Sequence, residues 1–392
     1  MNAHINLDRP IRHEPEFLDA LMRERMAEGS VHPTRTVLGA TEPGPGAIQL
    51  RSNDYLALAS DPRIAYAKAE ALQAEGHGDA ISRVFAHQRN DRHRAFERRM
   101  ASWLKAEDAV LAMSGYSANT GLIQAFARPD QPVYIDQRAH ASLRDGITMA
   151  GARARVFRHN SPDHLETLIA RHGPGLIAVD ALYSTDGAIC PLEDMVALAE
   201  RTGSALIVDE THSFGCAAGG AGLCEELGLS DRVHFRTVGL SKAMTARGGV
   251  VAGSARAMEF LRYEARPMIF STSVLGYEIA GFDKTLDIIA AEPWRRARLR
   301  DSHHRLTQGL LDLGYEVAES DRQIVAITTG TDSATVRFRD ALAAQGLFGS
   351  VFCAPATPVD RAIIRLTLNA DLTRHDIARA LQIFAKARRA LH

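Results

Sequence analysis

Short apolar runs alternate with longer amphipathic segments between residues 132 and 238, and this alternation constrains the fold more than any other feature of the chain. The apolar runs predict buried strands over Pro132–Asp136, Gly175–Asp180, Ala205–Asp209 and Val233–Val238. Between them, Pro162–His172 and Leu192–Thr202 have the pattern of amphipathic helices. A strand and helix alternation of this kind predicts an α/β fold with a mostly parallel sheet that is covered on both faces.

Three of these predicted strands end in an aspartate, namely Asp136, Asp180 and Asp209. In an open parallel sheet, ligands bind at the carboxyl ends of the strands. We therefore expect the functional site at the edge where these carboxylates lie.

The pattern changes after about residue 285. A helix over 294–313, an apolar run at 324–328, a helix over 333–345, a run at 349–353, a strand over 363–368 and a last helix from Asp376 predict a small α+β domain. The segment Glu42–Gly46 is rich in Pro and Gly, which indicates a hinge. We predict an N-terminal helix and arm (1–46), a large domain (47–288) and a small domain (289–392).

The composition excludes several classes of protein. The net charge is -1, from 46 basic and 47 acidic side chains, so no overall field attracts nucleic acid or an anionic membrane. The four cysteines show no metal-binding spacing, and we expect no metal site. We find neither a signal-peptide pattern nor an apolar stretch of about 18 residues. We expect a soluble, cytoplasmic protein whose partners are small molecules and further copies of itself.

Lys242 is the lysine whose surroundings suggest chemistry. The chain has five lysines, and Lys242 alone follows an apolar run and precedes the pair Gly248-Gly249, which we interpret as leaving room for a flat ring. Asp209, at the end of an apolar strand, is followed by His212. A lysine and an aspartate delivered in this way suit pyridoxal phosphate, because the lysine bonds the cofactor and the aspartate keeps the pyridine nitrogen protonated.

Two further segments are consistent with this cofactor. Ser114, Gly115 and Tyr116 follow the apolar run at 109–113 and open a predicted helix, whose backbone N–H groups could bind a phosphate. An ordinary serine N-cap is the simpler interpretation of Ser114 taken alone. His140 lies four residues after Asp136 at a strand end, where it could reach the face of the ring; a lone histidine is more often structural.

Two other classes of function fit less well. An apolar strand that ends in Asp-Glu-x-His is similar to the magnesium-binding strand of helicase-type nucleotidases, but no lysine of this chain lies in the GxxxxGK[ST] loop which those enzymes need. A regulator that uses the cofactor domain as a sensor would need a basic DNA-binding extension. The roughly 45 residues before the hinge are too few and too mixed in charge for one.

Taken together, the motifs resemble those of the α-oxoamine synthases, a family of fold type I pyridoxal phosphate enzymes. The resemblance runs from about Leu50 to the C-terminus and is carried by Ser52–Leu58, Ser114–Tyr116, Asp209–His212, Lys242, Phe270–Ser273 and Ile364–Leu368. It implies a large domain with a seven-stranded, mostly parallel sheet. Within the family, Arg171–Gly175, Glu226–Leu229, Val233–Phe235, Gly346–Cys353 and Pro355–Thr357 are similar to synthases of α-hydroxyketone quorum-sensing autoinducers.

The resemblance also implies a role for each matching residue. Lys242 would bond the cofactor, Asp209 would meet the pyridine nitrogen, and His212 and Ser184 would lie near the phenolic oxygen. His140 would stack on the ring. Phosphate contacts would come from Ser114, Gly115, Tyr116 and Ser241, and from Ser271 and Thr272 of a neighbouring subunit, which implies a homodimer with shared sites. The substrate site would include Asn53, Tyr55 and Arg365, with Asn53 and Arg365 holding the carboxylate.

The activity that the resemblance implies is the condensation of an amino acid with an acyl-CoA, with loss of carbon dioxide, to give an α-aminoketone. In the autoinducer branch the acyl chain is of medium or greater length, and the donor is S-adenosylmethionine or 2-aminobutyrate. An 8-amino-7-oxononanoate synthase is the alternative, and an aminotransferase a more distant one.

The chain departs from the family pattern at two places. Gly239 stands where relatives often have Thr or Ser, so Ser241 or Thr237 would have to replace that hydroxyl. In addition, Ile81–Gln88 differs from the usual glycine-containing motif, which puts glycine and alanine as amino donors in doubt.

Overall fold

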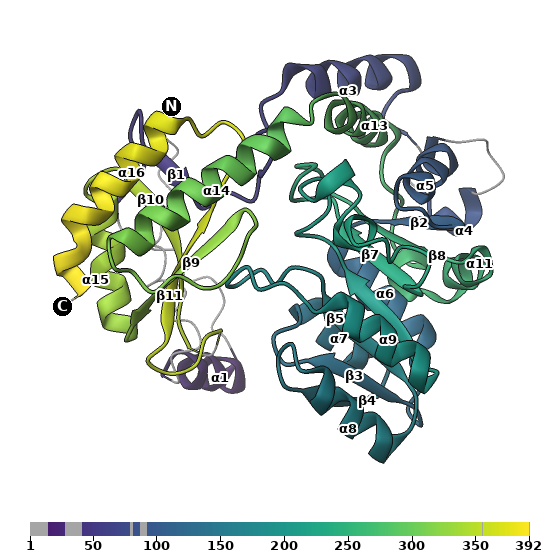
Figure 1. Ribbon diagram of the computed structural model, residues 1–392. Helices are drawn as coiled ribbons and strands as arrows, with labels where there is room; N and C mark the ends of the chain where they lie inside the picture. Colours follow the sequence, from purple (N-terminus) through teal and green to yellow (C-terminus); the bar gives the residue numbers. More distant parts are fainter. Residues whose placement is uncertain (1–14, 28–40, 79–80, 87–91, 355, 392) are drawn as a thin grey trace.

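The computed structural model describes residues 15–27, 41–78, 81–86, 92–354 and 356–391. Figure 1 shows two lobes, each built on its own sheet, and the long helix α14 (Trp294–Asp312), which runs from beside α3 (Pro62–Glu75) and α13 (Gly276–Ala291) to the smaller lobe. The helix α1 (Glu16–Ala27) precedes the first described strand.

The large sheet has seven strands in the order β2-β8-β7-β6-β5-β3-β4. The five strands from β7 to β4 in this order run parallel, whereas β8 is antiparallel to both β7 and β2. Their bounds are β2 (Asp108–Ala112), β3 (Pro132–Asp136), β4 (Arg153–Phe157), β5 (Leu176–Asp180), β6 (Ala205–Asp209), β7 (Phe235–Gly239) and β8 (Gly249–Gly253). The mostly parallel, seven-stranded sheet is therefore confirmed.

Helices cover both faces of this sheet. Successive residues of a strand point to opposite faces, so a strand that is apolar throughout has an apolar surface to bury on each side. On β3, Val133 and Ile135 pack in one core layer, while Tyr134 packs in the other. The first layer includes α6 (Gly115–Phe126), α7 (Ala141–Met149), α11 (Ala255–Glu264) and α12 (Arg266–Ile269). The second includes α8 (Pro162–His172), α9 (Leu192–Thr202) and α10 (Leu223–Glu226).

The small sheet has the order β1-β10-β11-β9, with β9 (Ile324–Gly330), β10 (Leu347–Phe352) and β11 (Ala362–Thr367) forming its antiparallel part. It packs with α15 (Asp332–Ala343) and α16 (Arg374–Ala387). The short helix α4 (Arg83–Ala86) and the helix α5 (Arg92–Trp103) belong to the other lobe.

The strand β1 (Ile48–Leu50) corrects the expected domain boundary at residue 47. We expected this segment in the large domain, but β1 pairs in parallel with β10 of the small sheet. The chain therefore contributes to the small sheet before it enters the large one, and Asn53 and Tyr55 follow directly from this crossing strand. The remaining domain division stays a prediction.

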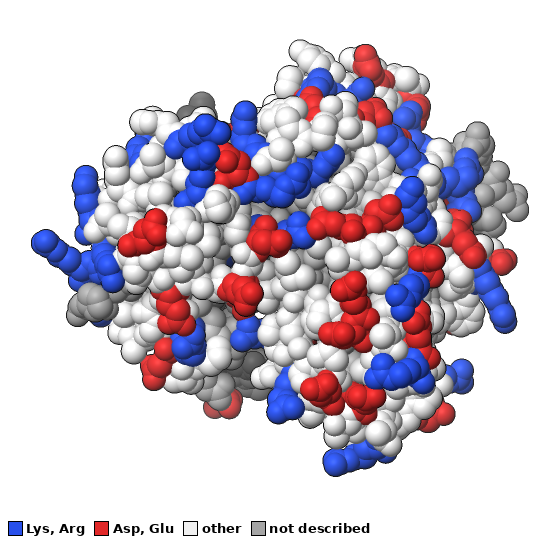
Figure 2. Space-filling view, viewed as in Figure 1, with Lys and Arg blue, Asp and Glu red and all other residues white. Residues whose placement is uncertain are grey.

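Charged side chains of both signs are interspersed over the face that Figure 2 shows, with basic ones prominent where α14 lies. None of the helices in the described part of the chain is long and apolar enough to cross a membrane.

Candidate active site

Asp209 ends β6 with its carboxylate buried among hydrogen-bond donors. The Asn119 amide donates to Oδ2 at 2.6 Å, and the Thr211 backbone N–H donates to Oδ1 at 2.8 Å. No ion pair of Asp209 occurs within the described ranges, although the residue is only 5% exposed. A buried carboxylate held by neutral donors suits a cationic ligand group such as a protonated pyridine nitrogen.

A chain of hydrogen bonds connects Asp209 to His140. The same Asn119 amide lies 2.9 Å from the Ser142 hydroxyl, which in turn lies 2.7 Å from Nδ1 of His140. The backbone N–H of His140 donates to the Asp180 carboxyl at 3.1 Å. Sequence reasoning missed Asn119 and Ser142; a polar side chain in the buried helix segment 118–123 is a local signal for Asn119, but it does not show which group the amide meets.

His212 lies three residues beyond Asp209, with its Nδ1 2.6 Å from the hydroxyl of Tyr55. That hydroxyl also lies 3.3 Å from the side-chain oxygen of Asn53. Burial, together with the charges of Lys242 and Arg365, lowers the pKa of His212, so the imidazole is neutral. Tyr55, which we expected to bind the substrate directly, is fully buried with its hydroxyl on His212.

Lys242 lies in the turn that connects the antiparallel strands β7 and β8. Hydrogen bonds from Leu240 to Gly248, from Ala246 to Leu240 and from Thr245 to Lys242 hold this turn. Burial lowers the pKa of Lys242, and the Arg365 charge lowers it further, whereas the Asp209 carboxylate acts in the opposite direction. The lysine therefore gains access to its neutral, nucleophilic form.

Arg365, on β11 of the small sheet, comes within electrostatic range of Lys242 in the large lobe. Its Nη1 donates to the Ser184 carbonyl oxygen at 2.6 Å, and its guanidinium stacks 4.7 Å from the Phe352 ring. The buried Nε has no hydrogen-bond partner, and no carboxylate pairs with Arg365 within the described residues. This arrangement leaves a buried cation available for an incoming carboxylate.

Ser114 is the N-cap of α6, as the simpler interpretation of this serine predicts. The Ser114 hydroxyl accepts from the Ser117 N–H at 3.0 Å, and the helix begins at Gly115. A Cβ on Gly115 would lie 2.7 Å from the Cα of Gly239, so the glycine brings the helix start against the strand that leads to Lys242. Helix N-termini bind phosphate well, so this N-cap is compatible with the predicted phosphate contact, which stays a prediction.

Gly249 has a different role from the one we expected. A Cβ on this residue would overlap the Ser114 carbonyl oxygen, so the glycine lets β8 approach the start of α6 and is not there to make room for a ring. Tyr116 is half exposed, and its hydroxyl donates to Asp145 at 2.6 Å.

Gly239 lacks the hydroxyl that relatives often have at this position, and the hydroxyl of Thr211, which sequence reasoning did not consider, lies beside it. The Gly239 backbone N–H donates to the Thr211 hydroxyl at 2.7 Å. Of the two replacements we considered, Thr237 is buried with an unpartnered hydroxyl and Ser241 is exposed. Thr211 thus occupies the space beside Gly239, next to the start of α6.

Ser271 and Thr272 follow α12 at the surface. The Ser271 hydroxyl donates to the Pro267 carbonyl oxygen at 2.5 Å, and Thr272 forms an isolated bridge with Ser82. In the described part of this chain, no hydrogen bond joins either residue to Asp209, His212 or Lys242. Their expected role therefore depends on a second subunit.

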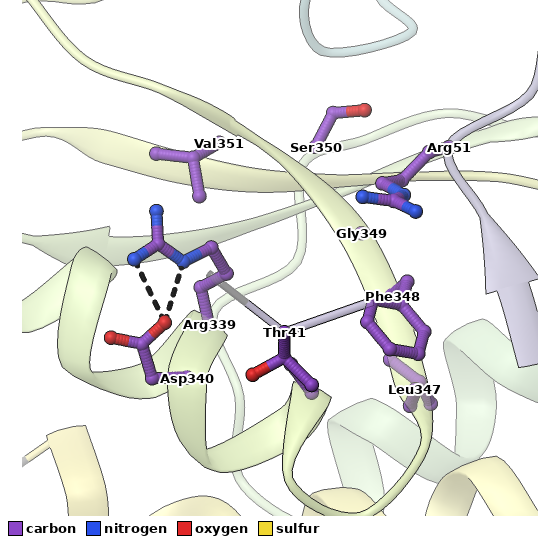
Figure 3. Close-up of a pocket in the computed structure, with 10 residues that line it drawn as sticks. Thr41, Arg51, Arg339, Asp340, Leu347, Phe348, Gly349, Ser350 and Val351 are labelled. Atoms are coloured by element: carbon purple, nitrogen blue, oxygen red, sulfur yellow. Dashed lines mark hydrogen bonds and ion pairs between the residues drawn. The ribbon is translucent and has the colours of Figure 1, made fainter. Parts of the chain in front are cut away.

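A separate cavity lies beside β10 and α15 (Figure 3). Arg51 stacks on Phe348 and Arg339 pairs with Asp340 there, and none of the predicted cofactor or substrate residues lines it. Its volume of about 150 Å³ is below the roughly 300 Å³ usual for a small-molecule site. The described residues also contain no cluster of acidic, histidine or cysteine side chains suited to a metal ion.

The fold, the buried Asp209 and the lysine on the β7–β8 turn fit pyridoxal phosphate, and the architecture is that of the fold type I pyridoxal phosphate transferases. Residues 45–384 match the family model of class I and II aminotransferases. A CAI-1 autoinducer synthase from Vibrio campbellii is 39% identical to this chain, with 94% of each chain covered. An 8-amino-7-oxononanoate synthase from Anaeromyxobacter dehalogenans is 37% identical, with 86% of this chain and 84% of the relative covered.

Among solved structures, a serine palmitoyltransferase from Sphingomonas wittichii superposes with a TM-score of 0.87 at 28% identity, covering 97% of this chain and 99% of its own. The chain belongs to the class I and II aminotransferase family and, within it, to the α-oxoamine synthases. It is a pyridoxal phosphate-dependent acyltransferase.

Proposed function

We propose that this enzyme condenses an amino acid with a medium- or long-chain acyl-CoA, releases CoA and carbon dioxide, and yields an α-aminoketone precursor of an α-hydroxyketone autoinducer. We further propose S-adenosylmethionine or 2-aminobutyrate as the amino donor and the cytoplasm as the location. The similarity to a CAI-1 autoinducer synthase over 94% of the chain supports the autoinducer branch.

The assignment of an amino acid as substrate is supported mainly by the buried guanidinium of Arg365, which is unpaired with any carboxylate among the described residues. Its charge lies near Lys242, and its Nε has no protein partner. A substrate carboxylate that meets this guanidinium, with Asn53 as its second ligand, would be fixed relative to Lys242. An amino acid thereby binds in one orientation.

The remaining residues serve the proton chemistry. Bound pyridoxal phosphate withdraws electrons from the α-carbon of the amino acid, which makes loss of a proton there possible. Asp209 would hold the proton on the pyridine nitrogen, and the neutral amine of Lys242 would accept the α-proton. When the cofactor is bound, His212 and Ser184 would contact its phenolic oxygen, His140 would cover the ring, and the start of α6 with Ser241 would hold the phosphate.

We also propose a homodimer in which Ser271 and Thr272 complete the partner's site. Large apolar side chains are exposed close to these residues: Phe270 is 74% exposed, and Phe85, on α4, which packs with α12, is 76% exposed. Exposed aromatic side chains of this size favour burial against another surface, and a second copy of this chain is the occupant that we propose.

A thiol-release assay tests the reaction. We expect thiol release that requires both substrates, is fastest with medium or long acyl chains, and prefers S-adenosylmethionine or 2-aminobutyrate over glycine and alanine. A preference for alanine or glycine would favour the alternative, an 8-amino-7-oxononanoate synthase, to which relatives at 36% and 37% identity point. Amino transfer to a keto acid without thiol release would instead indicate an aminotransferase.

A further inference from the structure

The pair formed by Tyr55 and His212 joins two parts of the site that lie far apart in the sequence. Tyr55 follows β1 of the small sheet, and His212 follows β6 of the large one. Their contact, 2.6 Å between the phenol oxygen and Nδ1, is among the short hydrogen bonds of the site. The two rings are also packed, with centroids 6.0 Å apart.

The protonation states limit how this hydrogen bond can be arranged. Burial raises the pKa of Tyr55, so the phenol keeps its single proton. Because His212 is neutral, one of its two nitrogens carries a proton. The contact to Nδ1 is 2.6 Å and the contact to the Asn53 oxygen is 3.3 Å, so the phenol O–H is better placed to donate to Nδ1.

The other nitrogen, Nε2, has no hydrogen-bond partner within the described residues, and it is not among the buried polar atoms that lack one. The charged and titratable groups near His212 are Lys242, Arg365 and His140. The His212 carbonyl oxygen accepts from the Gln323 amide at 2.6 Å, which fixes the backbone behind the ring. Nε2 therefore lies on an accessible side of the ring, in a site whose charges include Lys242.

We propose that Tyr55 is a positioning residue: its phenol donates to Nδ1 of His212 and thereby fixes the imidazole with its proton on Nε2, directed at the phenolic oxygen of the cofactor. This inference rests on the proposed function, because it takes His212 as the partner of that oxygen. It replaces direct substrate binding as the role of Tyr55. The Asn53 side-chain oxygen lies 3.3 Å from the same phenol oxygen, so the proposed carboxylate site adjoins this pair.

The substitution Tyr55→Phe tests the proposal, since it removes the O–H and keeps the ring. The N–H of His212 would be a second donor to the phenolic oxygen, beside the Lys242 nitrogen. This second hydrogen bond would weaken the attraction of the oxygen for the proton that it shares with the Lys242 nitrogen. Loss of a correctly oriented donor should therefore move the pH midpoint of the bound cofactor's visible absorbance to a higher value. We also expect kcat to fall roughly tenfold, with a small change in KM for the amino acid.

Two controls separate this role from a general loss of stability. Tyr315→Phe removes another buried phenol O–H, which donates to the Phe384 carbonyl oxygen at 2.7 Å in the small domain, and should leave the absorbance midpoint unchanged. In a His212→Gln background, Tyr55→Phe should cause no additional shift, because Tyr55 acts through His212.

An unchanged midpoint in Tyr55→Phe would overturn the proposal, as would an equal shift in the His212→Gln background. The absorbance measurement needs only the bound cofactor, so it separates this inference from the proposed function. If the wild-type enzyme releases no thiol, the proposed reaction fails while the Tyr55 result still stands.

Discussion

At the scale of single residues, the site depends on side chains whose contacts are distant in the sequence. Asn119 and Asp209 are separated by 90 positions, and Tyr55 and His212 by 157. Lys242, Asp209 and His212 could be recognised from local patterns because each follows an apolar strand. Asn119 could not, because only tertiary contact shows that its amide meets a carboxylate.

Asn119→Ala should weaken both the fold and cofactor binding. The substitution removes a donor from a buried carboxylate, at a cost of about 1–3 kcal/mol in unfolding free energy. Cofactor affinity should fall because Asp209 loses its orientation. Urea unfolding and cofactor titration measure the two effects. Gln124→Ala, on the same helix but without a contact to Asp209, should leave the affinity unchanged, and equal affinity losses in both variants would contradict this role.

Gly239 and Thr211 should behave as a compensating pair. A Cβ at Gly239 would lie 3.0 Å from Cγ2 and 3.1 Å from Oγ1 of Thr211. Gly239→Ser should therefore destabilise the fold by about 1–3 kcal/mol through overpacking. Thr211→Ala removes both atoms, so the double variant should recover most of that loss. A double-mutant cycle in urea checks this, and simple additivity would show that the two residues are independent.

Arg365 should control the protonation of Lys242. Burial is the main cause of the lowered pKa of the lysine and the Arg365 charge lowers it further, so Arg365→Gln should raise that pKa part of the way toward the ordinary value of 10.5. The pH midpoint for the reaction of Lys242 with pyridoxal phosphate in the apoenzyme should move to higher pH. Stopped-flow absorbance across a pH series measures this midpoint. Arg361→Gln, at a surface pair with Glu316, is the matched control and should cause no shift.

At the scale of elements, regular segments were well predicted and edge segments were not. The predicted bounds of β3, β6, α8 and α9 agree with the structure residue for residue, because each has a clear apolar period. β4 was missed because most of this edge strand is exposed and shows no apolar run. β1 was missed because it has three residues and is stabilised by pairing with the distant β10.

The close packing of β8 against the start of α6 leads to a prediction about these two elements. Gly249→Ala would place a methyl group on the Ser114 carbonyl oxygen, so the strand, the helix start or both must move. We expect a loss of about 3 kcal/mol or more and weaker cofactor binding, since both the phosphate end and the Lys242 turn are displaced. Gly44→Ala, where a Cβ meets nothing within 4 Å, should be nearly neutral in the same thermal and binding measurements.

At the scale of the whole molecule, the site joins both lobes and, in our proposal, two subunits. Arg365 lies on β11 of the small sheet and Tyr55 follows β1, while Lys242, Asp209 and His212 come from the large lobe. The two-lobed α/β architecture followed from the pattern of strands and helices. The crossing of β1 into the small sheet did not, because nothing in three residues indicates which sheet they join.

Hybrid dimers test the shared site. One subunit carries Lys242→Ala and the other carries Ser271→Ala with Thr272→Ala. If Ser271 and Thr272 serve the partner, the hybrid contains one site with all wild-type residues and recovers about half of wild-type activity, although each parent dimer is impaired. Activity of purified hybrids, with their mass measured by light scattering, decides this. Hybrids no more active than the parents would show that each chain builds its own site.

The most direct test of the account is to identify the lysine that bonds the cofactor. Borohydride reduction of the loaded enzyme, followed by peptide mass mapping, should place the cofactor on Lys242, and Lys242→Ala should remain folded but carry no label. Cofactor found on Lys68, Lys105, Lys284 or Lys386 of the wild-type enzyme would contradict the site built around Asp209, His212 and Arg365.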